Sequence, residues 1–83
     1  MANHGRVLGE IERVYDYSVG SIAFEAEAII EELIEAFKDN DIDMRMLAEY
    51  EIEELPRRSF DDASYDAVYD VAALIIRYTQ NKY

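Results

Sequence analysis

The spacing of the apolar residues, and the scarcity of residues that interrupt it, constrains the fold of this chain most strongly. Only three glycines and one proline occur in its 83 residues. The apolar residues between them recur three and four positions apart, which is the period of an α-helix. The sequence therefore predicts an all-α protein, a compact bundle of about four short helices. No cysteine supplements the core, and we expect residues 1–83 to form a single helical domain.

Four segments of the chain carry this pattern and are separated by turn residues. Ser21 is expected to cap the second segment at its N-terminus, and Asp41 or Asp43 the third. Ser59, followed by Asp62 three residues later, resembles a capping box at the start of the fourth. The expected helices run from about Arg6 to Tyr17, from Ser21 to Lys38 or Asp39, from Asp41 or Asp43 to Leu55, and from Ser59 toward Lys82 and Tyr83.

The charge balance of the chain restricts its partners. There are 19 Asp and Glu residues against 8 Lys and Arg residues, a net charge of −11. Direct binding to nucleic acid or to a membrane is disfavoured, because such binding depends on clustered Lys and Arg. No apolar stretch typical of a signal peptide follows Met1–Val7, and the longest wholly apolar run, Val71–Ile76, is too short to span a bilayer. We therefore expect a basic partner and a cytoplasmic location, in the host cell cytoplasm if the chain is phage-encoded.

An acidic segment between the second and third expected helices resembles part of a calcium-binding loop. Asp39, Asp41 and Asp43 match the first, third and fifth positions of an EF-hand loop. The sixth position requires glycine but is Met44, and the twelfth requires a bidentate glutamate but is Tyr50. We therefore interpret the segment as an acidic turn that caps the third helix, with a weak cation site as the alternative.

The sequence offers no set of residues suited to catalysis or to a metal centre. A dinuclear centre in a helical bundle needs Glu-x-x-His pairs, and the single histidine, His4, precedes the first expected helix. A serine nucleophile would need a neighbouring base, which a histidine in that position does not supply. No glycine-rich phosphate loop is present either. We expect no enzyme activity, no metal and no cofactor.

Carboxylates repeat every four residues on two of the expected helices. This spacing places like charges on one helix face, where each pair costs about 0.2–0.5 kcal/mol of helix stability. Tyr65 and Tyr69 fall beside the second row, where rigid amphipathic rings would anchor an interface. We call Glu27, Glu31 and Glu35 the Glu stripe, and Asp62, Asp66 and Asp70 the Asp stripe.

The two stripes and the two tyrosines are the candidate partner-binding residues. Four residues of helix advance the charge by about 6 Å, which is close to the distance between neighbouring phosphates along one nucleic-acid strand. Two such rows on one rigid body would fit a groove built for a phosphate backbone. The alternative is a solvated acidic face that serves solubility only.

In size, charge and carboxylate spacing over the second to fourth helices, the chain resembles the small acidic proteins by which phages disarm host enzymes. These include anti-CRISPR and anti-restriction proteins and inhibitors of DNA repair glycosylases. The resemblance implies a stoichiometric protein inhibitor that binds a basic nucleic-acid-binding enzyme, such as a CRISPR effector, a restriction enzyme or a repair enzyme. It also implies that the Glu and Asp stripes mimic nucleic acid, with carboxylates where the enzyme expects phosphates.

The alternative hypothesis is a helical protein-protein interaction module of adaptor or immunity type. It would form a homodimer through an apolar face such as Ile30, Ile34 and Ile76, and its charge would serve solubility. Salt distinguishes the two hypotheses. A mimic's association weakens steeply with salt and competes with DNA or RNA, whereas an apolar dimer is nearly insensitive to salt.

Overall fold

The described part of the chain, residues 4–82 of a computed structural model, is helical almost throughout. Residues 4–82 contain no strand, and one short 3₁₀ turn, η1, follows the third helix. The expected all-α bundle is confirmed, with four helices that correspond to the four predicted segments. The elements are α1 (His4–Ser18), α2 (Phe24–Lys38), α3 (Met44–Glu54), η1 (Leu55–Arg57) and α4 (Asp62–Lys82).

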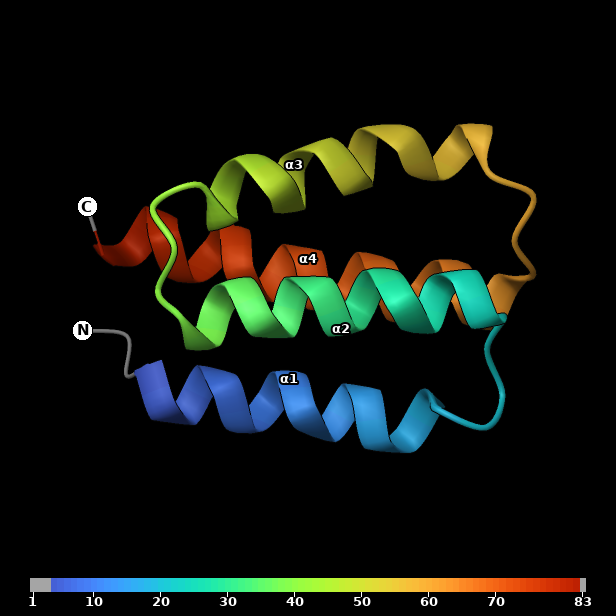
Figure 1. Cartoon of the computed structure of the whole chain (residues 1–83), viewed down its shortest axis with the longest axis horizontal. Coiled ribbons are helices and arrows are strands. Elements are labelled where there is room, and N and C mark those ends of the chain that lie inside the picture. The colour runs from blue at the N-terminus through green and yellow to red at the C-terminus, as the bar shows by residue number, and fades with distance from the viewer. Residues whose placement is uncertain (1–3, 83) are drawn as a thin grey trace.

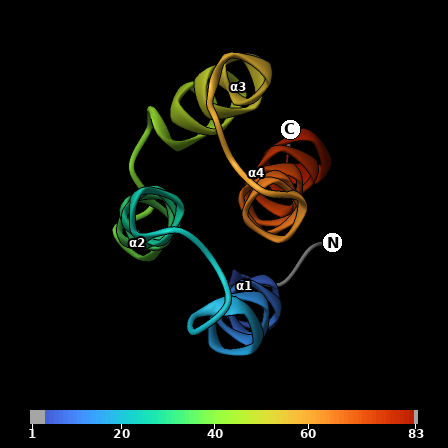
Figure 2. The same cartoon turned by 90° about the vertical axis from the view of Figure 1, so that its right-hand side faces the viewer.

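Successive helices run in opposite directions, so α1 begins and α4 ends at the same end of the bundle (Figure 1). Viewed along the bundle, α2 and α4 face each other, and α1 and α3 lie on opposite sides of that pair (Figure 2). The contacts agree with this view, because α2 and α4 each pack against the other three helices. α1 therefore borders α2 on one side and α4 on the other.

The core is built from the apolar stripe of each helix, as the spacing predicts. The buried residues of α2, α3 and α4 recur three and four positions apart, and α1 buries Ile11 and packs partly buried residues at the same spacing around it. This is the pattern of amphipathic helices that each have one apolar face. Ile30 is fully buried and Ile34 is 7% exposed. The predicted self-association face is therefore wrong, because two of its three residues already fill the core. The largest fully buried side chains include Ile11, Ile30, Leu33, Phe37, Leu55 and Ile75.

The end of the bundle near the start of α1 is closed by a cluster of three rings. The His4 ring stacks on Phe37, with ring centroids 4.3 Å apart and an interplanar angle of 11°. Its Nδ1 lies 3.3 Å from the Tyr78 hydroxyl. The expected position of His4 before the first helix is therefore wrong, because α1 already begins there. The histidine has a packing role that joins α1, α2 and α4.

Two predicted helix caps are also wrong. The Ser21 N–H donates to the Ser18 carbonyl at 2.8 Å, in the turn after α1, and α2 begins only at Phe24. α4 begins at Asp62, so its N-cap position is Asp61. Ser59 lies two residues before that position and therefore does not cap the helix.

The cap of α4 is the carboxylate of Asp61. Its Oδ1 accepts the Ser64 backbone N–H at 2.7 Å, which is the bond that an N-cap residue makes to the third helical position. Hydrogen bonds from the Ser64 side chain and backbone lower the pKa of Asp61 below its ordinary value of 3.8. The buried Ser64 hydroxyl also accepts the Ala23 N–H at 2.8 Å. One serine thus joins the starts of α2 and α4.

No helix in the described part of the chain is both long and apolar enough to cross a membrane. The longest, α4, carries the exposed residues of the Asp stripe along one side.

Candidate protein-binding surfaces

The Glu stripe lies on the side of α2 that faces α1. The Tyr15 hydroxyl, on α1, donates to Glu31 Oε1 at 2.7 Å and lies 3.2 Å from Glu27 Oε1. The hydrogen bond to Glu31, then burial, then the charge of Glu31, raises the pKa of Tyr15 far above its ordinary value of 10. Tyr15 therefore remains a neutral donor at physiological pH and holds two carboxylates of the stripe in place.

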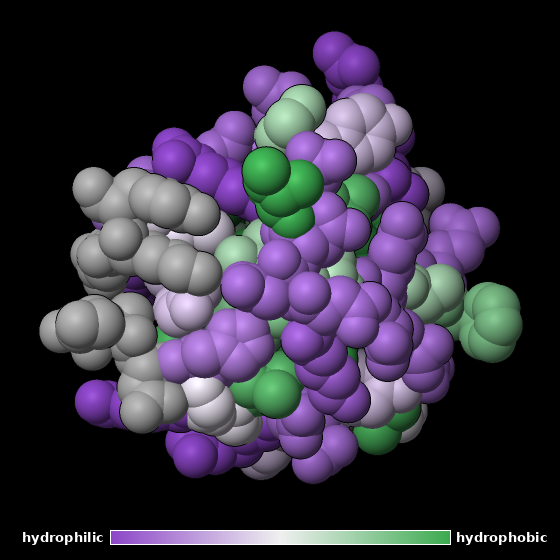
Figure 3. All heavy atoms as spheres, turned by 60° about the vertical axis from the view of Figure 1, so that its left-hand side comes forward, coloured by the Kyte–Doolittle hydropathy of each residue, from purple (hydrophilic) through white to green (hydrophobic). Residues whose placement is uncertain are grey.

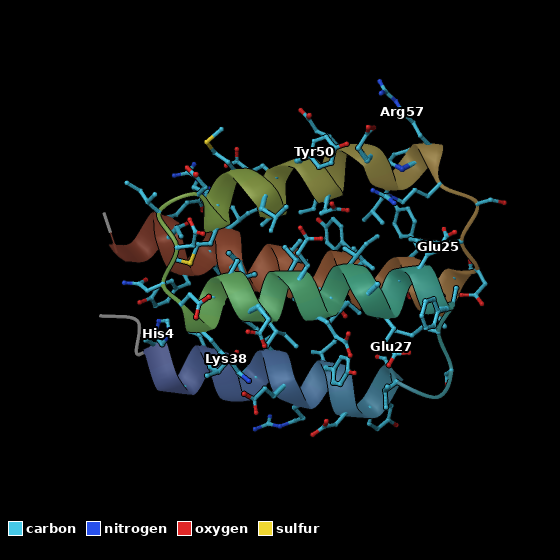
Figure 4. All side chains as sticks on the ribbon, viewed as in Figure 1. His4, Glu25, Glu27, Lys38, Tyr50 and Arg57 are labelled. Atoms are coloured by element: carbon cyan, nitrogen blue, oxygen red, sulfur yellow. The ribbon has the colours of Figure 1, made fainter. Side chains whose placement is uncertain are left out.

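Carboxylates from both helices meet in the groove between α1 and α2. The groove contains a depression of about 380 Å³ in which four carboxylates and one ammonium group meet. That ammonium group, of Lys38, lies 4.0 Å from Glu12 at one end of the groove. Figure 4 shows Lys38 and Glu27 between α1 and α2, near opposite ends of α2. The depression is lined by Glu12, Tyr15, Asp16, Glu31, Ile34, Glu35 and Lys38.

The Asp stripe lies on the solvent side of α4. Its three carboxylates are exposed, and none forms an ion pair with a described residue. Tyr65 and Tyr69, beside it, are 38% and 46% exposed. All of the predicted partner-binding residues of α4 are therefore accessible to a partner.

The structure does not bring the two stripes together into one groove. Asp70 lines a second depression, between α4 and α1, together with Arg13 and Tyr17. The groove of the Glu stripe lies on the other side of α1. Because α1 packs against both α2 and α4 (Figure 2), and each stripe borders a different side of α1, the two stripes flank this helix instead of facing each other.

One charged pair was not predicted from the sequence. Glu51 of α3 is only 5% exposed, and its Oε2 accepts a hydrogen bond from the Arg58 guanidinium at 3.1 Å. Burial raises the pKa of Glu51 above its ordinary value of 4.5; Arg58 opposes this rise, and Glu32 and Glu54 add to it. The spacing in the sequence was the available signal, because Glu51 lies three residues after the buried Ala48 and four before the buried Leu55.

The acidic segment between α2 and α3 forms a helix end followed by a tight turn. Asn40 has a φ of 51°, the left-handed conformation typical of the residue after a helix. Its N–H donates to the Phe37 carbonyl at 3.1 Å, and the Asp41 N–H donates to the Ala36 carbonyl at 3.0 Å. The Asp41 carboxylate accepts the Asp43 N–H at 2.8 Å. These bonds make a Schellman motif and an Asx turn.

The same segment bears on the alternative of a weak cation site. Asp39, Asp41 and Asp43 are all exposed, and Asp43 stands directly before α3 without a side-chain cap bond. Among residues 4–82 no group of three or more His, Cys, Asp or Glu side chains is arranged to hold a metal ion. These bonds support an acidic turn, but the predicted cap of the third helix is wrong. The Asp41 carboxylate bonds the Asp43 N–H, and Asp43, at the N-cap position, forms no side-chain bond to α3.

Comparisons of this chain with models of known families, with curated proteins and with solved structures found no match.

Proposed function

We propose that this chain is a stoichiometric protein inhibitor that binds a basic nucleic-acid-binding enzyme through its acidic helix faces, as a nucleic-acid mimic. The observation that carries the proposal is the groove between α1 and α2. Four carboxylates and one ammonium group line it, so it attracts cationic side chains. An enzyme that binds nucleic acid presents such side chains in its own binding site.

Two of the three carboxylates of the Glu stripe, those of Glu27 and Glu31, are held in place before any partner arrives. Tyr15 contacts Glu27 and Glu31 at once, which reduces the freedom that these side chains would lose on binding. A carboxylate row held at a fixed spacing resembles a phosphate backbone more closely than a set of mobile side chains does.

The Asp stripe supplies a second acidic face on the other side of α1. Its carboxylates have no cation to displace among the described residues, and two partly exposed tyrosines flank it. Tyrosine and arginine recur among the residues that contribute most to protein interfaces. The partner is therefore expected to bind on both sides of α1 and to contact both stripes with arginine and lysine side chains.

The test is an affinity capture from nuclease-treated microbial lysate at low and moderate salt, followed by mass spectrometry. The wild-type chain should retain a basic nucleic-acid-binding enzyme that added DNA or RNA releases. The variant Glu31→Lys with Asp66→Lys should lose this enzyme because the charge of both stripes is reversed.

The matched control is Glu25→Lys with Asp39→Lys, which alters the net charge equally at exposed sites outside both stripes. It should retain the enzyme. If both variants lose the partner equally, only the overall charge matters and the stripes have no specific role. A captured partner that is indifferent to nucleic acid would contradict the proposal.

A further inference from the structure

Three large apolar side chains on and beside α3 point into solvent. Ile42, in the turn before the helix, is 91% exposed, Met46 is 69% exposed and Tyr50 is 53% exposed. Met46 and Tyr50 are four residues apart and so lie one above the other on the helix. We call Ile42, Met46 and Tyr50 the α3 apolar face.

This face looks away from the bundle. The inward side of α3 carries Met44 and Ala48, each two residues from Met46, so Met46 projects in the opposite direction. Figure 4 shows Tyr50 on the outer side of α3, and Figure 3 shows hydrophobic side chains among hydrophilic ones at the top of the molecule, over this helix.

Ile42 is exposed although its position offers a way to bury it. Ile42 stands immediately before Asp43, the N-cap residue of α3. An apolar side chain at this position often packs onto the fourth residue of the helix, here Leu47. At 91% exposure Ile42 does not make this contact. A partner that covers Ile42 would gain apolar burial that the fold itself leaves unused.

The charges around the face identify the kind of partner. Arg45 pairs with Glu49 at 2.7 Å and Arg57 pairs with Glu54 at 3.1 Å, so the charges of these two cations are matched by two carboxylates. Asp43 and Glu53 have no cation partner among the described residues. Beside Tyr50, a depression of about 480 Å³ is lined by Tyr50, Glu53, Glu54 and Arg57.

This arrangement disfavours a second copy of the chain as the occupant. A copy would place the same unpaired carboxylates opposite each other, on a molecule whose net charge is −11. A basic partner would match the rim. Apolar residues one helical turn apart, flanked by charge, are the contact that an amphipathic helix makes in a helix-to-helix interface.

We propose that the α3 apolar face docks a basic amphipathic helix of the partner protein. The apolar residues of that helix cover Ile42, Met46 and Tyr50, and its lysines or arginines reach Asp43 and Glu53. The inference rests on the proposed function, since it names the part of the basic partner that α3 contacts. It adds an apolar contact that the Glu and Asp stripes do not provide.

The test uses two fluorescent peptides as probes. One is an amphipathic helix of leucine and lysine; the other has the same lysines but alanine in place of every leucine. Measured by fluorescence anisotropy at physiological ionic strength, the leucine peptide should bind the wild-type chain at least about tenfold more tightly than the alanine peptide. The variant Met46→Ser with Tyr50→Ser should bind the leucine peptide about tenfold more weakly than the wild type.

The matched control is Phe24→Ser, which removes an apolar side chain that is 84% exposed at the start of α2. It should bind like the wild type, and circular dichroism should show the same helicity for all three chains. Equal loss in both variants, or equal binding of both peptides, would overturn the inference. The inference would also be overturned if the wild-type chain sediments as a dimer and the variant Met46→Ser with Tyr50→Ser sediments as a monomer.

The inference and the proposed function can fail separately. If the peptide result fails while the stripe variant still loses a captured enzyme that nucleic acid displaces, only the α3 inference is wrong. If the stripe variant keeps the enzyme, the proposed function is wrong whatever the peptides show.

Discussion

At the residue scale, Glu51 shows how a carboxylate in an apolar position changes the balance of forces. Its pKa is raised because burial outweighs the nearby Arg58 guanidinium. A raised pKa means that the folded chain binds this proton more tightly than the unfolded chain. The stabilising contribution of Glu51 is therefore fully present below pH 4.5 and is lost as the pH rises through the pKa of the folded chain.

The variant Glu51→Gln should therefore raise the melting temperature at about pH 7 and have less effect at about pH 4. Glutamine keeps the shape of the side chain but cannot ionise. Thermal unfolding followed by circular dichroism at the two pH values measures this difference. Glu53→Gln, which removes a charge from an exposed position of α3, is the control for net charge. A lower melting temperature of Glu51→Gln at neutral pH would show that the ion pair with Arg58 outweighs the cost of burial.

At the scale of the helices, the junction between α2 and α4 depends on Ser64. Its hydroxyl accepts the Ala23 N–H, and its own N–H donates to Asp61. Ser64→Ala should lower the free energy of unfolding by about 1–3 kcal/mol, because the Ala23 N–H loses its acceptor. Urea unfolding measures the change. Ser59→Ala, at the exposed serine predicted to be the cap, should stay within about 0.5 kcal/mol of the wild type. A loss for Ser59→Ala as large as that for Ser64→Ala would contradict this assignment of the two serines.

The helices themselves were predictable, because their apolar spacing and the few breakers between them depend on local sequence. The helix starts were less predictable, since Ser64 and Ala23 are 41 residues apart and meet only in the folded bundle. The candidate site was likewise predictable only in part. The two stripes follow from four-residue spacing, whereas their separation by α1 depends on how the helices pack. The exposure of Met46 and the burial of Glu51 were readable from position on α3, but only once the inward side of that helix was known.

At the scale of the whole molecule, the excess of negative charge opposes folding through repulsion within both stripes. Salt screens this repulsion. The melting temperature of the wild type should therefore rise with added sodium chloride, and it should rise less for Glu31→Gln with Asp66→Gln, which removes one charge from each stripe. A melting temperature that falls with salt would show that ion pairs such as Arg45–Glu49 outweigh the repulsion.

The acidic faces are proposed to occupy the site in which a basic enzyme binds nucleic acid. The most direct measurement is a titration of the captured enzyme, saturated with fluorescent DNA or RNA, with the purified chain. We predict that the nucleic acid is released completely at one chain per binding site, and that the stripe variant Glu31→Lys with Asp66→Lys releases none. A stable ternary complex of enzyme, nucleic acid and chain would contradict the mimic mechanism.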